Sequence, residues 1–187
     1  METQRFELGE LLRDRQILTR YFIAPTIYRL AKSQKHWRDG ERDITVAFRK
    51  TAKSRPKDVL VRVQWSQATM ALEFGYTQVR EDLRKLRDSM NENATTELAA
   101  LGVAFVLVKL LLPNDRITRV VQIGGRGDFY LNGQRDQMIE ISGTVRGNLN
   151  ERFQTKREQI LLNKSLRKAW VNVSRFAIPD SRLERVK

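Results

Sequence analysis

The spacing of apolar residues predicts several helices. Apolar side chains recur every three or four positions, as on one face of a helix, in four parts of the chain. Two of these parts lie within residues 1–35, on either side of Pro25, and the others are residues 79–90 and 149–160. Lys156 falls on or beside the apolar stripe of the last helix, a position from which lysine usually reaches out to water.

Alternation of apolar and polar residues predicts strands elsewhere in the chain. The alternating segments are residues 59–65, 68–74, 117–123, a hairpin within 124–144, and 169–176, where Pro179 is expected to end the last strand. The first two are expected to pair through a turn at Ser66 and Gln67. The pattern predicts an α+β (α/β) protein, with a helical and β-hairpin region at residues 1–90 and a core at residues 91–187.

The stretch from Gly124 to Thr144 predicts a hairpin that carries two carboxylates. Asn132-Gly133 is a strong turn signal, because both central residues of a type I′ turn need positive φ. Strand alternation places Glu140 and Ser142 on one face, and a loop centred near Gln134 would set Asp128 directly opposite Glu140. Side chains so opposed have Cβ atoms roughly 5 Å apart. Two carboxylates that close repel, so the sequence leaves two interpretations: a divalent-metal site or a wet sheet face.

The long apolar run at residues 98–112 raises the question of a membrane helix. At ~1.5 Å per residue it covers about 22 Å, short of the ~30 Å hydrocarbon core. It also contains Gly102 and Lys109. We therefore predict a buried core helix that begins near Thr95, with Asn93 as a candidate N-cap, and no membrane partner.

Charge favours a polyanionic partner. The 187 residues include 35 Lys+Arg and 22 Asp+Glu, giving a net charge of +13 and a pI near 10.5. Such an excess indicates nucleic acid or an acidic protein surface, and general solubility is the alternative. The chain has no cysteine, which excludes disulfides and thiolate metal sites, and its first residues are too charged for a signal peptide. A cytoplasmic location is expected.

Residues 29–57 form a basic stretch with aromatic side chains among the cations. They contain ten Lys/Arg and three Asp/Glu, together with His36 and Trp37. One interpretation is a nucleic-acid contact, in which cations bind phosphates and bases stack on tryptophan. The other is a solvated loop with the tryptophan tucked into the core. The candidate contacts are Lys35, Trp37, Arg38, Arg49, Lys50 and Lys53.

From Thr95 onward the predicted order is helix, strand, strand, strand, helix, strand. An acidic residue begins the second strand, and Glu140-Ile141-Ser142 lies in the third. This order and this motif resemble the core of the PD-(D/E)XK, or restriction-endonuclease-like, nuclease superfamily over about the last half of the chain.

The resemblance implies a set of site residues. Asp128 and Glu140 would bind Mg²⁺ or Mn²⁺, and Glu97 would be the first-helix glutamate that adds a ligand or positions a water. The motif lysine falls on Ser142, where this chain departs from the pattern. Some members supply that lysine from the following helix, and Lys156 is the candidate here. The remaining candidate nucleic-acid contacts around the site are Arg126, Arg152 and Gln159.

Three functions remain open from the sequence. The first is a Mg²⁺-dependent nuclease (a hydrolase of phosphodiester bonds) that acts on nucleic acid, DNA being favoured over RNA, with Asp128, Glu140 and Lys156 as catalytic residues. The second is a catalytically inactive protein that keeps the fold to bind nucleic acid or a partner, for which Ser142 is the best support. The third is a structural subunit of a larger assembly, bound to a protein partner through residues 1–35 and its basic surface, with the acidic hairpin as an ordinary wet sheet face.

Overall fold

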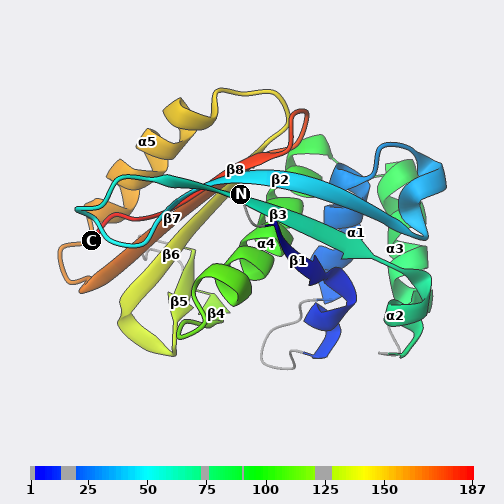
Figure 1. The fold of residues 1–187 in the computed structure, drawn as a ribbon, viewed down its shortest axis with the longest axis horizontal. Helices are drawn as coiled ribbons and strands as arrows, with labels where there is room; N and C mark the ends of the chain where they lie inside the picture. Colours follow the sequence, from blue (N-terminus) through cyan, green and yellow to red (C-terminus); the bar gives the residue numbers. More distant parts are fainter. Residues whose placement is uncertain (1–2, 14–19, 73–75, 90, 121–127) are drawn as a thin grey trace.

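The computed structural model describes residues 3–13, 20–72, 76–89, 91–120 and 128–187, and within them eight strands form one mixed sheet (Figure 1). The strand order is β1-β3-β2-β8-β7-β6-β5-β4. The strands are β1 (Thr3–Glu7), β2 (Gly40–Arg49), β3 (Lys57–Trp65), β4 (Ile117–Val120), β5 (Phe129–Leu131), β6 (Gln134–Thr144), β7 (Lys168–Arg175) and β8 (Asp180–Arg185). Helices accompany this sheet, so the α+β prediction is confirmed.

The helices of the described residues are the 3-10 helices η1 (Leu8–Arg13) and η2 (Gln34–Trp37), and the α-helices α1 (Arg20–Leu30), α2 (Gln67–Leu72), α3 (Tyr76–Ser89), α4 (Glu92–Leu111) and α5 (Leu149–Leu161).

Two of these helices, α4 and α5, cover the strands of the C-terminal half from its two sides. On β6, Ile139 and Ile141 share the core cluster of α4, whereas Met138 packs in a second cluster with Phe153 and Ile160 of α5. Because neighbouring strand residues face opposite ways, α4 and α5 cover opposite faces of the sheet (Figure 1).

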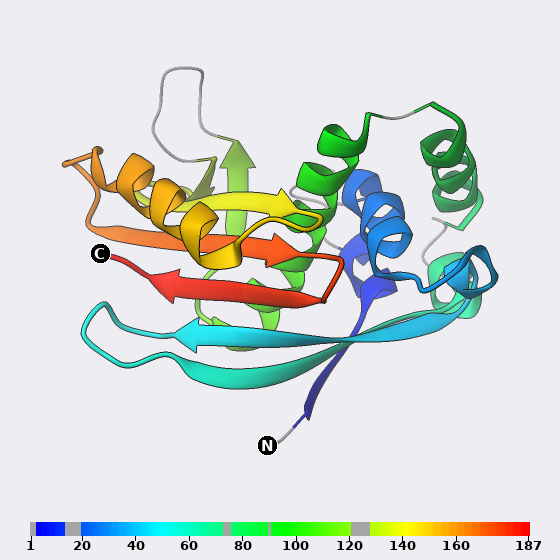
Figure 2. The same ribbon diagram turned by 90° about the horizontal axis from the view of Figure 1, so that it is seen from above.

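α5 covers only part of its face. It contacts β6, β7 and β8, and β2 and β3 continue beyond it (Figure 2). On the other face, α1 packs between α4 and α3. Among the described helices, α4 alone is long and apolar enough by composition to cross a membrane, but 61% of that apolar window is buried inside the protein, a property that core helices share. Its middle, from Gly102 to Val108, is buried throughout.

The helical prediction for residues 1–35 is wrong in part. Thr3–Glu7 is a strand, β1, which pairs in parallel with β3. Leu8–Arg13 is a 3-10 helix, and α1 begins at Arg20, so Pro25 lies inside that helix and not in its first turn. β1 is only five residues long and its partner is far away in sequence, so local spacing carries almost no signal for it.

The predicted pairing of residues 59–65 with 68–74 is also wrong. Residues 67–72 form the helix α2, and β3 pairs instead with β1 and with β2, the latter in an antiparallel register. The strand β2 lies within the basic stretch, for which the sequence suggests a contact surface or a loop. Its buried residues Ile44 and Val46 alternate with charged and polar ones, a strand pattern that the high charge conceals.

Two boundaries differ in the C-terminal half. Asn91, not Asn93, caps α4, since its side chain accepts a hydrogen bond from the Asn93 N–H. The chain also does not leave the sheet at Pro179, because Asp180–Arg185 forms a further strand, β8. β8 pairs antiparallel to β7 and parallel to β2. One sheet therefore contains strands from before and after residue 90.

Candidate functional site

The β5–β6 hairpin sets the two predicted carboxylates opposite each other. Its turn is tight, with φ of 56° at Asn132 and 70° at Gly133, so the wider loop considered from the sequence is not present. The register changes between Leu131↔Gln134 and Tyr130↔Met138, which leaves residues 135–137 of β6 as a bulge. Continuing the pairing Phe129↔Ile139 by one residue then places Asp128 opposite Glu140. The bulge therefore creates the register that a wider loop would have created.

Asp128 extends the ladder between β5 and β6. Its N–H donates to Ile139 O at 3.2 Å, and its Oδ2 accepts from the Ile141 N–H at 2.7 Å. Burial raises the pKa of the Asp128 carboxyl, an effect opposed by the Ile141 hydrogen bond and the Lys156 charge. The side chain lines an open cavity of about 360 Å³ with Glu97 and Lys156. Its Oδ1 has no hydrogen-bond partner among the described residues, so it is available to a ligand in that cavity.

Glu140 and Lys156 form an ion pair between β6 and α5. Lys156 Nζ donates to Glu140 Oε1 at 2.6 Å, and the Glu140 side chain is fully buried. Lys156 also donates to Gln159 Oε1 at 3.3 Å. Burial, and then the neighbouring Asp128 charge, raise the pKa of Glu140, and Lys156 opposes both effects. Lys156 therefore points toward the carboxylates and not out to water.

One oxygen of Glu140 is left without a partner. Glu140 Oε2 is buried and makes no hydrogen bond with the described residues. Leaving a buried charged oxygen unpaired costs free energy, so such an atom usually marks a place where a ligand, an ion or water is bound.

Glu97, Ser142 and Arg152 form a second network beside the first. Arg152 donates through Nη2 to Glu97 Oε1 at 2.6 Å and through Nε to Ser142 Oγ at 2.8 Å. The Ser142 hydroxyl donates to Glu97 Oε1 at 3.2 Å, and the Gly143 N–H donates to Glu97 Oε2 at 3.0 Å. Both Glu97 oxygens are therefore occupied by protein groups.

Gly143 is a site residue that the sequence analysis missed. A Cβ at this position would lie 2.6 Å from Thr96 O and 2.9 Å from Ala100 Cβ, so glycine allows β6 to approach α4 closely. That approach brings the Gly143 N–H to Glu97. A glycine inside a strand pattern is a known signal for close backbone approach and could have indicated this contact.

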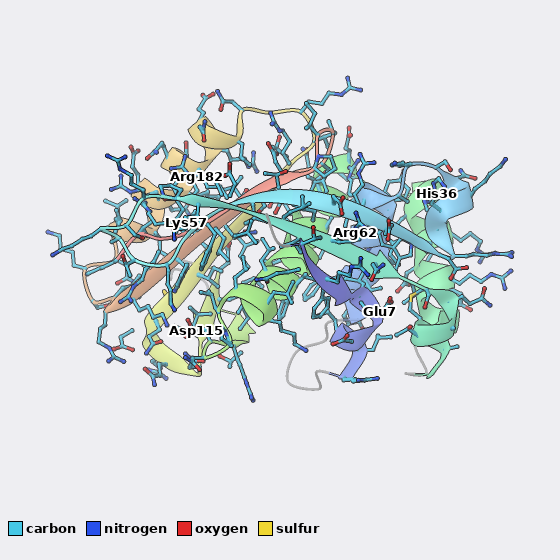
Figure 3. All side chains as sticks on the ribbon, viewed as in Figure 1. Glu7, His36, Lys57, Arg62, Asp115 and Arg182 are labelled. Carbon is cyan, nitrogen blue, oxygen red and sulfur yellow. The ribbon has the colours of Figure 1, made fainter. Side chains whose placement is uncertain are left out.

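The basic stretch does not form one surface. Lys35 and Arg38 are exposed around η2, whereas Lys50 and Lys53 are exposed after β2. The ten residues of β2 separate these ends by about 30 Å at ~3.3 Å per residue. His36 and Lys57 mark the two ends in Figure 3.

Two members of the predicted basic set have structural partners. Trp37 is partly buried, and its ring lies 5.6 Å from that of Tyr28, centroid to centroid. Arg49 forms an ion pair with the buried Glu184. Trp37 therefore packs partly against the core, and Arg49 is engaged by a buried carboxylate. Arg126 lies outside the described residues.

A metal ion would have a restricted set of ligands here. No group of three or more His, Asp or Glu side chains in the described ranges is arranged to hold a metal ion. Glu97 is committed to Arg152, and Glu140 Oε1 to Lys156. The oxygens left over are Asp128 Oδ1 and the unpartnered Glu140 Oε2. Both are hard carboxylate donors, and Mg²⁺ often uses only one or two of these and keeps several waters, so the residues fit it.

No protein-family model, no curated protein and no solved structure matches this chain. The arrangement of side chains described above is therefore what bears on its function.

Proposed function

We propose that this protein is a divalent-metal-dependent nuclease that acts on DNA, built on a restriction-endonuclease-like core that runs from α4 to β7. The order of elements in this part is α4, β4, β5, β6, α5 and β7, the order on which the resemblance rests. The net charge of +13 supports a polyanionic substrate.

The observation that carries the proposal is the 2.6 Å contact between Lys156 Nζ and Glu140 Oε1. The motif lysine is replaced by Ser142, so a nuclease of this kind needs a lysine from elsewhere. Lys156 comes from the helix that follows β6 and reaches the carboxylate that the motif assigns to the metal. A lysine that merely snorkelled to water would have no reason to approach a fully buried glutamate.

Each residue of the site has its own role in the proposed reaction. Asp128 Oδ1 and Glu140 Oε2 would hold Mg²⁺ or Mn²⁺. When bound, the metal supplies an activated water and neutralises charge on the phosphate. Lys156, once a metal shares the charge of Glu140, has an ammonium group free to orient the attacking water or a phosphate oxygen. Gln159 accepts from the same ammonium and limits its rotation.

The test is cleavage of plasmid and of short single-stranded DNA with Mg²⁺ or Mn²⁺. The wild-type protein is compared with Asp128→Ala, Glu140→Gln and Lys156→Met. Asp136→Ala is the matched control, since Asp136 belongs to the same hairpin but pairs with Arg167 away from the site. We expect metal-dependent cutting that all three site variants lose and the control keeps. Cutting that survives Asp128→Ala would show that another site, or a contaminant, is responsible.

An inactive DNA-binding protein is the second candidate. Two of the acidic residues that the resemblance assigns to metal, Glu97 and Glu140, are each neutralised by a cation of α5. The same samples separate the two candidates when DNA binding is measured at two salt concentrations. Binding that weakens steeply with salt, without any cutting, would favour this second function.

A further inference from the structure

The Glu97 network defines a role for that residue different from metal binding. Glu97 Oε1 accepts from Arg152 at 2.6 Å and from Ser142 at 3.2 Å, and Glu97 Oε2 accepts from the Gly143 N–H at 3.0 Å. These donors use three of the roughly four lone-pair sites of a carboxylate, which leaves Glu97 poorly suited to bind a metal. Glu97 instead offers its oxygens to three donors that fix its own position and that of Arg152.

Arg152 is held at two of its three nitrogens. Nε binds Ser142 Oγ at 2.8 Å and Nη2 binds Glu97, whereas Nη1 has no partner among the described residues. The Arg152 side chain is 41% exposed, so part of it is open to solvent. A guanidinium fixed in this way has little rotational freedom left to lose when it binds an oxyanion.

Arg152 lines an open cavity. This cavity has a volume of about 640 Å³ at the end of β6, and Arg146 supplies a second cation to it. Arg146 is exposed and has no ion-pair partner among the described residues. The cavity also contains Glu92 and Glu97, but Glu92 pairs with Arg29 at 3.5 Å and Glu97 with Arg152. The cation left without a carboxylate partner in the described part of this cavity is therefore Arg146.

The residues that line this cavity neighbour those of the proposed reaction site. Arg152 and Lys156 are four residues apart on α5, so their Cβ atoms are about 5–6 Å apart on one helix face. Ser142 and Glu140 are two residues apart on the same face of β6. Another open cavity, of about 420 Å³, is lined by both Arg152 and Lys156, and Glu151 also borders it.

We propose that Arg152, held by Glu97 and Ser142, and Arg146 form a seat for a backbone phosphate next to the phosphate that reacts. Glu97 is then a positioning residue and not a metal ligand. The chemical class of the ligand is a phosphodiester of a nucleic-acid strand. The assignment of the neighbouring phosphate as the reacting one rests on the proposed function, but phosphate binding itself does not.

The effect of Glu97→Ala on DNA affinity tests the proposal, because two explanations predict opposite directions. Glu97→Ala removes a negative charge, so simple electrostatics predicts tighter DNA binding. A positioning role predicts weaker binding, because Arg152 loses the group that holds it. Binding is measured by fluorescence anisotropy with a short fluorescein-labelled DNA strand in EDTA, where neither cleavage nor metal binding contributes.

We expect Arg152→Ala to weaken binding about tenfold and to reduce the slope of log affinity against log salt by about one. Glu97→Ala should weaken binding severalfold, and the double variant should bind no more weakly than Arg152→Ala alone. Arg157→Ala is the matched control for lost charge on α5, because Arg157 lines none of these cavities. Glu158→Gln is the control for lost acidity.

Two results would overturn the phosphate seat. One is that Glu97→Ala binds DNA as tightly as the wild type or more tightly. If the alanine variant is less stable than the wild type, Glu97→Gln is measured as well and should give the same result. The other is an equal effect of Arg152→Ala and Arg157→Ala.

Calorimetric titration with Mn²⁺ tests whether Glu97 is a metal ligand. Glu97→Gln should bind Mn²⁺ as the wild type does, whereas a loss would make Glu97 a metal ligand after all. A wild-type protein that binds no Mn²⁺ would end the nuclease proposal and leave the DNA-binding result to decide the phosphate seat.

Discussion

Lys156 Nζ lies 2.6 Å from Glu140 Oε1, and it neutralises a carboxylate that has no exposed surface. The pair joins α5 to β6 across the second hydrophobic cluster, where Phe153 and Met138 pack. An isolated buried charge is costly, so the helix and the strand depend on each other at this point.

Removing the lysine should expose that dependence. Lys156→Met leaves Glu140 buried without its cation, and we expect the free energy of unfolding to fall by about 3 kcal/mol at pH 8. The value is at the low end of the usual range because Lys156 is 23% exposed. Urea unfolding measures it, and adding Glu140→Gln should recover most of the loss. A Lys156→Met variant as stable as the wild type would mean that the pair contributes nothing.

Asp128 should make stability depend on pH. Burial raises its pKa in the folded protein above the ordinary value of 3.8. The folded state then holds the proton more tightly than the unfolded state, so this contribution to stability is full below pH 3.8 and is lost as pH rises through the raised pKa. Asp128→Asn does not titrate. We expect the wild type to lose stability relative to this variant as pH rises, by about 1.4 kcal/mol for each pH unit that separates the folded and unfolded pKa values.

Urea unfolding of the two proteins at a series of pH values, without metal, measures this difference. Identical pH profiles would show that the Asp128 carboxyl is not perturbed by folding.

A bound metal should stabilise the folded protein through the same carboxylates. If Asp128 and Glu140 hold Mn²⁺, saturating metal raises the unfolding free energy by about 2.7 kcal/mol at 100 times its dissociation constant. Thermal unfolding with and without Mn²⁺ should therefore show an increase in Tm for the wild type and none for Asp128→Asn. An equal increase in both proteins would place the ion elsewhere.

Restoring the motif lysine should not help this protein. Ser142 is 1% exposed and binds Glu97 and Arg152, so a lysine there must displace Arg152 and bring a second positive charge against it. We expect Ser142→Lys to cost about 2 kcal/mol or more and to lower any nuclease activity. Ser142→Ala, which only deletes hydrogen bonds, should cost about 1 kcal/mol. Higher activity in Ser142→Lys would contradict a role for Lys156.

Gly143 controls the approach of β6 to α4. An alanine Cβ would meet Thr96 O at 2.6 Å, and because that atom belongs to helix backbone it cannot move aside cheaply. We expect Gly143→Ala to cost about 1–3 kcal/mol in urea unfolding and to weaken DNA binding by shifting the amide that holds Glu97. A variant with unchanged stability and unchanged DNA affinity would show that the close approach has no role.

Local signals explain which parts of the fold could be predicted. The Asn132-Gly133 turn and the apolar stripe of α5 each depend on residues close together in sequence, and both are predicted from the sequence. Asn148 caps α5 by accepting from the N–H groups of Asn150 and Glu151, again a local contact. By contrast, β1 pairs with β3, which is far away in sequence, and its short segment shows no pattern of its own. β8 forms a hairpin with β7, but Asp180–Arg185 contains a single apolar residue, Leu183, so no alternation marks it as a strand.

In the candidate site, too, the features set by local sequence could be predicted and those set by tertiary packing could not. Alternation along β6 is enough to place Glu140 and Ser142 on one face, and helical spacing places Lys156 toward the core. The partner of Glu97 could not be predicted. It depends on where α4 begins relative to the end of β6, and that relation is a matter of tertiary packing around Gly143.

The position of β8 has a consequence for how the chain folds. It is the last described strand in sequence, yet it lies in the middle of the sheet, between β7 and β2. The β1–β3–β2 group can therefore join the other strands only after residues 180–185 have left the ribosome. Until then, each half presents an unpaired strand edge, which is prone to wrong pairing. We expect slow folding for this topology, with completion delayed until β8 has been synthesised.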